Sequence, residues 1–428
     1  MLLDSILSRL IRRGTLKVQH PDGTIRTFQG DRPGPSAAIA LTNRAITRRL
    51  IWNPSLAFGE GYMDGSIEPI EGSTIHDVMD LLILNLAGGS NHPAMRLNEG
   101  LRWVGRRLMD LNTASRSRRN VAHHYDLNGT LYALFLDADR QYSCAYFPTG
   151  QETLEEAQAL KKRHLASKLR LDRPDLEVLD IGSGWGGLAI TLARDFGARV
   201  TGLTLSEEQL AESRARAEAA GLSDRARFEL MDYRAWKRPM DRIVSVGMFE
   251  HVGINHYTPF FRTVKQALKE DGVALVHAIG QSEGPTTTSP WITKYIFPGG
   301  YSPALSEVVP AVEKAGLWIT DIEVLRLHYA KTIAHWRARF TSNRNAIKSL
   351  YDERFCRMFE FYLSCSELVF HHWGHMNWQV QLTRRIDALP LTRDYMFEAE
   401  RAATYPHDPP PSTALREKVG RDVERAGD

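Results

Sequence analysis

Three closely spaced glycines are the first residues whose spacing indicates chemistry. Residues 178–190 read VLDIGSGWGGLAI, in which Gly182, Gly184 and Gly187 form a G-x-G-x-x-G pattern. Between an apolar strand and a helix, such a loop brings backbone N–H groups close to a nucleotide. The pattern fits a dinucleotide such as NAD, and it also fits S-adenosylmethionine, whose sulfonium carries a transferable methyl group. The glycines therefore indicate either a redox enzyme or a methyltransferase.

The end of the next expected strand argues against NAD. Enzymes that bind NAD carry an acidic residue there, which hydrogen-bonds the ribose hydroxyls. In this sequence the strand ends in GLTLS, so Thr204 and Ser206 occupy that region. Glu207 and Glu208 come next, but they fall within the first turn of the following helix.

Two aspartates favour S-adenosylmethionine. Asp180 stands two positions before the first glycine, where a carboxylate repels a pyrophosphate and attracts a cationic aminoacyl group. Asp232 follows the third expected strand, where an acid commonly accepts a hydrogen bond from the adenine amine, although it also fits a simple turn. Together they make S-adenosylmethionine the preferred cofactor and NAD a distant second.

Five segments in order carry a more specific pattern. They are HHYDLNGTLYALFLDADRQYSCAYF, VLDIGSGWGGLAI, GLTLSEEQ, VGMFEHVG and HAIGQSEGPTTTSPWITKYIFPGGYSP. In this order they resemble the cyclopropane-fatty-acyl-phospholipid synthase family of methyltransferases. The resemblance covers residues 121–384 and, more weakly, LAFGEGYMDGSIE near the N-terminus. That N-terminal region favours the bacterial phospholipid-acting branch over the shorter mycolic-acid enzymes.

The resemblance implies a reaction and a catalytic set. The family transfers a methyl group to the cis double bond of a phospholipid acyl chain, and bound bicarbonate deprotonates the resulting carbocation so that a cyclopropane ring closes. The residues that match the bicarbonate site are Cys144, Glu250, His277, the backbone of Ile279, and Tyr329. Taken alone, His277 in VALVHAIG is more typical of a hydrogen-bonded strand histidine. Glu250 in the apolar segment MFEHVG needs a partner or a function.

The resemblance also implies the cofactor contacts. The matching positions are Tyr142 and Ser143 near the aminoacyl end, Gly182 and Gly184 beneath it, Thr204 and Gln209 near the ribose, and Asp232 and Tyr233 near adenine; Asp180 joins them from the argument above. Aromatic faces can stabilise a carbocation without quenching it. The candidates are Tyr142, Tyr146, Phe147, Trp291, Tyr295 and Phe297, although each one alone is more typical of core packing. The chain departs from the family at Ser183, which replaces a common cysteine, and at Cys365, which is displaced by one position and receives no catalytic role.

Alternating strands and helices must position these residues. Strands are predicted at 177–182, 198–206, 225–233, 241–253 and 273–280, with helices at 185–197, 206–221 and 260–272. Ser206 and Gln209 form a capping-box pattern, and Gly197 suits a helix C-cap. The fold class is therefore α/β, a parallel, doubly wound Rossmann-like methyltransferase sheet with a smaller N-terminal α+β domain.

The chain divides into four parts. Residues 1–95 form the N-terminal domain, for which lipid or membrane binding is expected, with an apolar stripe from Leu2 to Ile11 and a hairpin turn at 21–23. Such a stripe more often packs on its own domain than on a membrane. Residues 96–120 form a basic linker with six arginines and one aspartate between Arg102 and Arg119. Residues 121–390 form the catalytic domain, and residues 391–428 form a polar, loosely ordered tail.

Composition indicates the partners and the cellular compartment. The 54 basic and 51 acidic residues nearly balance, which gives no general preference for acidic partners. Three cysteines without CxxC spacing indicate a reducing compartment and argue against a zinc site, so no metal is expected. No signal peptide and no apolar stretch of roughly 20 residues is apparent. A cytoplasmic protein is expected, peripherally associated with the inner membrane surface, whose partner is phospholipid and not nucleic acid.

Other functions remain open at this point. Ring closure and methyl or methylene branching share the carbocation, so the sequence does not separate them, and some relatives methylate small amines. A non-catalytic lipid-binding protein and, from the arginine-rich linker, a nucleic-acid methyltransferase are weaker alternatives. Homodimerisation is a hypothesis that rests on the resemblance alone. Head group, chain length and double-bond position are not encoded in any recognised pattern.

Overall fold

The computed structural model describes residues 2–87, 100, 103 and 129–402 of the 428-residue chain. The basic linker expected at 96–120 lies outside these residues, apart from Gly100 and Trp103. The same holds for the first six residues of the HHYDLNGT segment and for residues 403–428.

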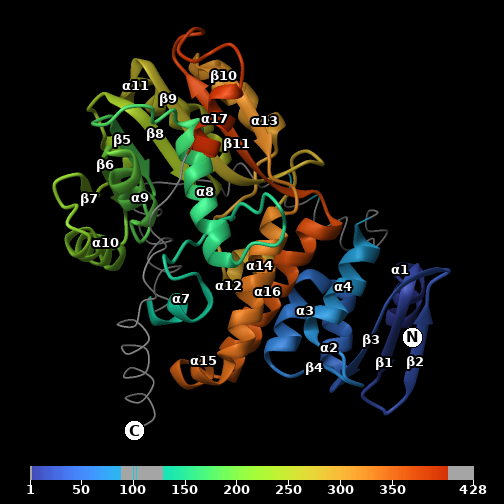
Figure 1. Ribbon diagram of the computed structural model, residues 1–428. Helices are drawn as coiled ribbons and strands as arrows, with labels where there is room; N and C mark the ends of the chain where they lie inside the picture. The colour runs from blue at the N-terminus through green and yellow to red at the C-terminus, as the bar shows by residue number, and fades with distance from the viewer. Residues whose placement is uncertain (1, 88–99, 101–102, 104–128, 403–428) are drawn as a thin grey trace.

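A seven-stranded sheet forms the centre of the catalytic region (Figure 1). Its strands, in spatial order, are β10 (Trp318–Val324), β11 (His375–Thr383), β9 (Leu268–Gln281), β8 (Met240–Val246), β5 (Glu177–Ile181), β6 (Arg199–Thr204) and β7 (Ala226–Leu230). The strands from β9 to β7 are parallel, and β11 runs antiparallel to both of its neighbours. The doubly wound α/β fold is thus confirmed, but the expectation of a wholly parallel sheet is wrong at β11, whose chain returns from a long helix and inserts between β9 and β10.

Helices cover both faces of the sheet. They are α8 (Leu154–Lys168), α9 (Gly187–Phe196), α10 (Glu207–Ala219), α11 (Tyr257–Ala267) and α13 (Leu305–Ala315). The sequence predicts α9, α10 and α11 with nearly these bounds, whereas α8 and α13 are not among its predictions. The Ser206 side chain accepts a hydrogen bond from the Gln209 backbone, and Gly197 ends α9 with φ = 64°. The helix expected to reach residue 272 ends at Ala267, because the following residues already belong to β9.

A second layer of helices covers the carboxyl ends of the central strands. It consists of α7 (Gly129–Phe135), α12 (Pro290–Tyr295), α14 (His328–Ser342), α15 (Arg344–Leu350) and α16 (Glu353–His372). The Asp352 side chain caps α16 by accepting from the Phe355 backbone, and α16 packs along α14. Tyr329 lies on α14, and two of the aromatic residues expected near the substrate, Trp291 and Tyr295, lie on α12.

The N-terminal α+β domain pairs a four-stranded sheet with short helices. Its elements are α1 (Leu2–Leu10), β1 (Arg13–Gln19), β2 (Ile25–Gln29), β3 (Arg32–Leu41), α2 (Arg44–Trp52), α3 (Pro54–Met63), β4 (Ile67–Pro69) and α4 (Ile75–Leu86). The sheet order is β2-β1-β3-β4, and the predicted hairpin turns at Gly23 with φ = 83°. Leu3 is buried in this domain while Leu2 is exposed, so part of the N-terminal apolar stripe packs on its own domain.

The N-terminal domain and the helical layer share one hydrophobic core (Figure 1). α3 and α4 pack against α16, and a side chain added at Gly59 would collide with the indole of Trp291. The Glu60 carboxylate accepts hydrogen bonds from Lys294 at 2.7 Å and from the Tyr295 hydroxyl at 2.9 Å. The aromatic helix α12 is therefore held against α3 of the N-terminal domain.

The tail expected from residue 391 onwards begins with a helix, α17 (Asp394–Ala402). α17 packs on α8, where the Glu400 carboxylate contacts Nδ1 of His164. Glu323 on β10 contacts the other ring nitrogen at 2.6 Å. The expectation of loose order is wrong for this stretch, because an ion-paired histidine anchors the polar helix.

Candidate active site

The glycine loop lies at the carboxyl end of β5, as the sequence predicts. Gly182, Gly184 and Gly186 have φ values of 84°, 54° and 81°, which side-chain-bearing residues rarely adopt. The backbone N–H groups of Gly182 and Ser183 donate to the Leu203 carbonyl of β6. A Cβ at Gly184 would have no atom within 4 Å, so this face of the loop is open. The third conformationally required glycine is thus Gly186, whereas Gly187 begins α9.

Asp180 is the most isolated buried acid of this region. Its side chain is 2% exposed, and its Oδ2 has no hydrogen-bond partner among the described residues. Burial raises the pKa of Asp180 to about 7, against the opposing effect of the Lys161 ammonium ion. A buried acceptor without a donor beside an open loop is chemically suited to a cationic ligand group.

Tyr142 and Ser143 lie in the loop between α7 and α8. The Ser143 hydroxyl accepts a hydrogen bond from Nζ of Lys161 at 2.7 Å. The Tyr142 ring stacks on Trp336 with centroids 5.1 Å apart, and its hydroxyl lies 2.8 Å from that of Tyr362. Neither Lys161 nor Tyr362 was identified from sequence, because both occur at ordinary helical spacing in α8 and α16.

The polar pair expected near the ribose is present at the end of β6. The Thr204 hydroxyl donates to Oε1 of Gln209 at 2.9 Å, and both side chains are buried. The Ser206 N–H donates to the same Thr204 hydroxyl. The Gln209 side chain, in the first turn of α10, therefore contacts Thr204 at the end of β6. NAD-binding enzymes have an acid at the end of this strand.

Asp232 and Tyr233 lie at the turn after β7. Asp232 accepts from the Arg234 backbone and forms an ion pair with its guanidinium at 2.5 Å. Tyr233 packs edge-on against Phe260, with ring centroids 5.3 Å apart. Asp232 thus stabilises the turn after β7. Its contact with adenine stays a prediction.

Glu250 and the backbone of Ile279 are brought together. The Glu250 side chain lies in the short helix η2 (Phe249–His251), and its Oε1 accepts from the Ile279 N–H at 2.7 Å. Its Oε2 is buried and lacks a hydrogen-bond partner in the described part of the chain. Burial raises the pKa of Glu250 to about 7. The carboxylate therefore has one fixed oxygen and one available oxygen.

His277 lies on β9 and faces side-chain amides of β11. Its ring nitrogens lie 3.1 Å from Nε2 of Gln379 and 3.3 Å from Nδ2 of Asn377. Burial lowers the pKa of His277 to about 3, so the imidazole is neutral. These contacts match the hydrogen-bonded strand histidine that the sequence alone favours.

Cys144 and Tyr329 flank the first turn of α14. The Cys144 thiol is fully buried and donates to the Ala145 carbonyl at 3.3 Å, and burial raises its pKa so that it stays protonated. The Ala145 N–H donates to the hydroxyl of Thr332, which lies one turn beyond Tyr329. The Tyr329 ring packs edge-on against both Trp336 and Phe370, at 5.7 and 5.1 Å.

The aromatic candidates separate into two groups. Phe297 lies 5.8 Å from Tyr362, which joins it to Tyr142, while Trp291 packs on Phe361 at 4.7 Å. In contrast, Tyr146 stacks between two histidine rings, His164 at 4.2 Å and His328 at 5.1 Å. Phe147 likewise stacks on His335 at 5.8 Å. Phe297 and Tyr142 thus contact the same residue, Tyr362, whereas Tyr146 and Phe147 pack against histidine rings.

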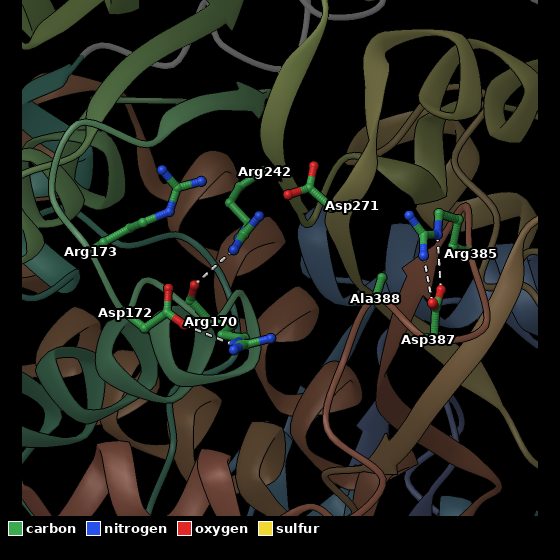
Figure 2. Close-up of a pocket in the computed structure, with 8 residues that line it drawn as sticks. All are labelled: Arg170, Asp172, Arg173, Arg242, Asp271, Arg385, Asp387 and Ala388. Carbon is green, nitrogen blue, oxygen red and sulfur yellow. Dashed lines mark hydrogen bonds and ion pairs between the residues drawn. The ribbon is translucent and has the colours of Figure 1, made fainter.

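A charged cavity of about 260 Å³ lies at the amino ends of the parallel strands, opposite the glycine loop (Figure 2). Its lining residues are Arg170, Asp172, Arg173, Arg242, Asp271, Arg385, Asp387 and Ala388. Arg242 donates to the backbone carbonyls of Leu169, Arg170 and Asp241. Arg170 pairs with Asp172 and Arg385 with Asp387, so this cavity has mainly structural ion pairs and lies apart from the expected site.

With this geometry established, comparison with known proteins gives the family. The sequence profile described as mycolic acid cyclopropane synthetase matches residues 112–380. The chain is 36% identical over 353 residues to a cyclopropane-fatty-acyl-phospholipid synthase of Escherichia coli, covering 82% of this chain and 89% of that protein. The chain belongs to the mycolic acid cyclopropane synthetase family. It is therefore an S-adenosylmethionine-dependent methyltransferase of the group that acts on fatty acyl chains.

Two further relatives extend the comparison. A probable fatty acid methyltransferase of Pseudomonas putida is 37% identical over 377 residues, with 85% of this chain and 92% of that protein covered. The mycolic acid cyclopropane synthase CmaA1, solved with SAH and CTAB, aligns with a TM-score of 0.59 and 32% identity over 62% of this chain and 97% of its own. Residues 2–87 match a separate domain of unknown function, in agreement with a distinct N-terminal domain.

Within residues 2–87 and 129–402, none of the helices has the length and apolar character needed to cross a bilayer. In the same part of the chain, no three His, Cys, Asp or Glu side chains are grouped as metal ligands.

Proposed function

We propose that the enzyme adds a methylene bridge across the cis double bond of a phospholipid acyl chain. S-adenosylmethionine, when bound, would supply the methyl group: its S–CH₃ bond breaks as a C–C bond forms to one alkene carbon, S-adenosylhomocysteine is released, and loss of one methyl proton closes the cyclopropane ring. The observation that carries this proposal is the buried Glu250, with one oxygen fixed by the Ile279 N–H and the other available. A family enzyme of 36% identity is named for this reaction.

We place bicarbonate beside Glu250, as the family resemblance implies. In this proposal Cys144 and Tyr329 supply S–H and O–H donors, and the free Glu250 oxygen accepts the proton of the anion. The Ile279 N–H, which donates to Glu250, and the His277 ring nitrogens, which contact Gln379 and Asn377, share these hydrogen bonds with the anion when it binds. When bound, bicarbonate supplies a base for the proton that ring closure releases. Glu250 is suited to this position because burial holds its pKa at about 7, near the working pH of a cytoplasmic enzyme.

The cofactor contacts are assigned in the same way. Asp180 receives the cationic amino group of S-adenosylmethionine, with Tyr142 and Ser143 beside it and Gly182 and Gly184 beneath. Thr204 and Gln209 approach the ribose, and Asp232 with Tyr233 approaches the adenine. The isolated Oδ2 of Asp180 and the open face of Gly184 support this placement.

The acyl chain is placed against the aromatic surface formed by Tyr142, Phe297 and Tyr362. This surface excludes water and offers ring faces to a cationic transition state. The N-terminal domain is proposed to contact anionic phospholipid at the inner membrane surface, with the enzyme in the cytoplasm and as a homodimer. The alternatives are a methyl- or methylene-branched acyl chain, or methylation of a small amine. The Pseudomonas putida relative is named as a probable fatty acid methyltransferase.

The test is a product analysis. Purified full-length protein is incubated with S-adenosylmethionine, bicarbonate and vesicles of monounsaturated phospholipid, and the released fatty acids are analysed by mass spectrometry. A gain of one CH₂ with the double bond consumed supports cyclopropanation, whereas a gain with an alkene or saturated branch supports the branched alternative. Absence of product, despite cofactor binding, refutes both lipid reactions.

A further inference from the structure

Lys161 on α8 is a buried cation, 1% exposed, to which no carboxylate of the described residues is hydrogen-bonded. Its Nζ donates to two neutral groups, Oε1 of Gln141 and the Ser143 hydroxyl, both at 2.7 Å. Its neighbour Lys162 instead donates to Asp139 at 2.5 Å. Burying an ammonium ion without a paired anion is costly, so the position of Lys161 calls for a function.

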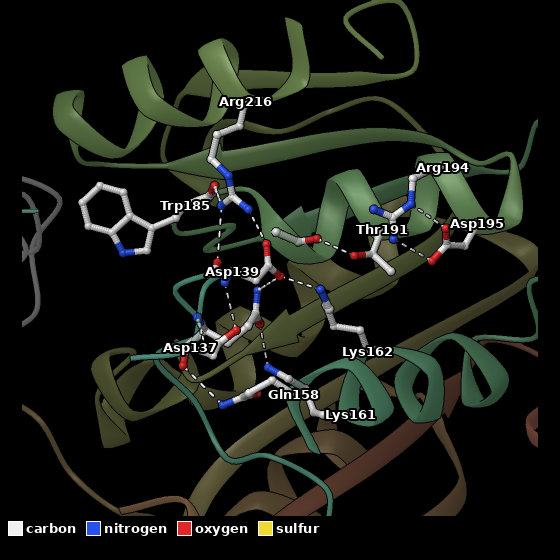
Figure 3. Close-up of polar contacts among 12 residues, drawn as sticks. Asp137, Asp139, Gln158, Lys161, Lys162, Trp185, Thr191, Arg194, Asp195 and Arg216 are labelled. Atoms are coloured by element: carbon white, nitrogen blue, oxygen red, sulfur yellow. Dashed lines mark hydrogen bonds and ion pairs between the residues drawn. The ribbon is translucent and has the colours of Figure 1, made fainter. Parts of the chain in front are cut away.

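Figure 3 shows the surroundings of this lysine. Lys161 and Lys162 extend from α8 toward the loop of Asp137 and Asp139, and Arg216 of α10 approaches Asp139 from the other side. The two cations on Asp139 hold its pKa well below the usual range, so its charge is already matched. Lys161 acts electrostatically on Asp137, Asp139, Cys144, His277 and Asp180.

Within this group, Asp180 is the acid whose buried Oδ2 has no hydrogen-bond partner among the described residues. Burial raises its pKa, and the Lys161 ammonium ion is the charge that opposes this effect. The same lysine fixes the Ser143 hydroxyl, next to Tyr142. One buried cation thus connects the two sides of the expected aminoacyl pocket, β5 and the loop before α8.

We propose that Lys161 is a positioning residue of the cofactor site, whose buried ammonium group orients Ser143 and supplies the positive charge that lets Asp180 hold the cofactor's amino group. The inference rests on the proposed placement of that amino group at Asp180. Lys161 touches neither the cofactor nor the lipid and acts through these two residues.

The pH dependence follows from this arrangement. Asp180 must be ionised to attract an ammonium group, so cofactor affinity falls as the pH drops through its pKa of about 7. Without Lys161 that pKa rises further, by about one unit or more for loss of a nearby opposite charge. Affinity is then lost at a higher pH. Burial lowers the pKa of Lys161 to about 8, so its effect is present below that pH.

The experiment measures binding of S-adenosylhomocysteine, which has the same amino group and no transferable methyl, by calorimetry from about pH 6 to pH 9. Lys161→Met is compared with wild type and with the control Lys162→Met, which removes a neighbouring cation that faces Asp139. For Lys161→Met we expect a midpoint displaced upward by about one unit, which makes affinity about fivefold weaker near pH 7 and about tenfold weaker near pH 6. The control retains the wild-type midpoint. The amino group of S-adenosylhomocysteine titrates equally in every experiment, so it does not contribute to the difference between variants.

A double-mutant cycle separates positioning from a general structural effect. In an Asp180→Asn background the substitution Lys161→Met should weaken affinity less than it does in the wild-type background, because the charge then has no ionised partner and only the orientation of Ser143 is lost. If Lys161→Met does not fold, Lys161→Gln, which keeps a donor for Ser143 and lacks the charge, provides the same comparison. An unshifted midpoint in the folded variant, or equal losses in both backgrounds, overturns the proposal. The assay uses no lipid, so failure of the lipid substrate leaves its result intact.

Discussion

The charged side chains at the two ends of the parallel strands differ in how they are paired. At the amino ends, Arg242 is buried and donates to three backbone carbonyls, and the arginines around it pair with aspartates. At the carboxyl ends, Asp180 and Glu250 each keep one buried oxygen without a hydrogen-bond partner among the described residues. Paired charge stabilises the fold, while unpaired charge is retained at a cost that a ligand can offset. We therefore expect the charged residues at the amino ends to stabilise the fold and those at the carboxyl ends to bind ligands.

The largest expected effect tests the carboxyl end directly. Replacing Glu250 by Gln removes the available carboxylate oxygen while keeping an acceptor for the Ile279 N–H. We expect kcat for lipid modification to fall by about 100-fold or more, the scale of general acid–base catalysis. Steady-state rates on phospholipid vesicles measure this, with cofactor affinity as the control. A variant that retains more than half of the wild-type kcat contradicts the assignment.

The matching substitution at the amino end is Arg242→Met. It leaves the carbonyls of Leu169, Arg170 and Asp241 without their donor, so we expect a loss of about 2–4 kcal/mol in the free energy of unfolding. Below its unfolding transition, the variant should bind S-adenosylhomocysteine with wild-type affinity. Denaturant unfolding and calorimetry check both parts, and a large loss of affinity with intact stability would reverse the comparison.

The pH dependence of stability sharpens the contrast. Burial raises the pKa of Asp180 and of Glu250 to about 7, above their values in the unfolded chain. The folded state then holds protons that the unfolded state releases, so these groups destabilise the protein increasingly as the pH rises from about 4 to 7. The double variant Asp180→Asn, Glu250→Gln should gain in Tm relative to wild type over that interval, with no further gain above it. Thermal scans at successive pH values measure the difference, and a constant difference refutes it.

The smallest effect concerns Cys365. This cysteine lies on α16, is partly buried and has no role in the proposed chemistry. We expect Cys365→Ser to change kcat less than twofold and stability by about 1 kcal/mol. Vesicle assays and thermal unfolding test this, with Cys144→Ser as the matched cysteine variant that should lower kcat. A tenfold loss of kcat for Cys365→Ser would contradict this and give the Cys365 thiol a role in the reaction.

The sequence predicts the part of the site that depends on local pattern. The glycine loop, Asp180 and the Ser206 cap follow from spacing, because backbone conformation and capping are local properties. The reversed strand β11, with its amides on His277, is not predictable in this way, since its register is set by contacts with β9 from residues about a hundred positions away. Lys161 was missed for a similar reason, because a lysine in a polar helix does not reveal that the fold buries it.

The N-terminal boundary illustrates the same limit. Sequence pattern separates a small α+β domain correctly, and residues 2–87 match a distinct domain. It does not predict that Gly59 packs against Trp291, or that one hydrophobic core joins this domain to α16. A local apolar pattern predicts that a helix face is buried, but it does not predict which other element that face packs against.

The most direct test of the account is the rate of CH₂ gain in phospholipid acyl chains, measured in bicarbonate-depleted buffer before and after bicarbonate is restored. If the free oxygen of Glu250 serves a bound anion, the wild-type rate should fall at least about tenfold on depletion and recover on addition. The Glu250→Gln rate should stay low in both buffers. A wild-type rate that is the same with and without bicarbonate would contradict the proposed use of this unpaired buried carboxylate.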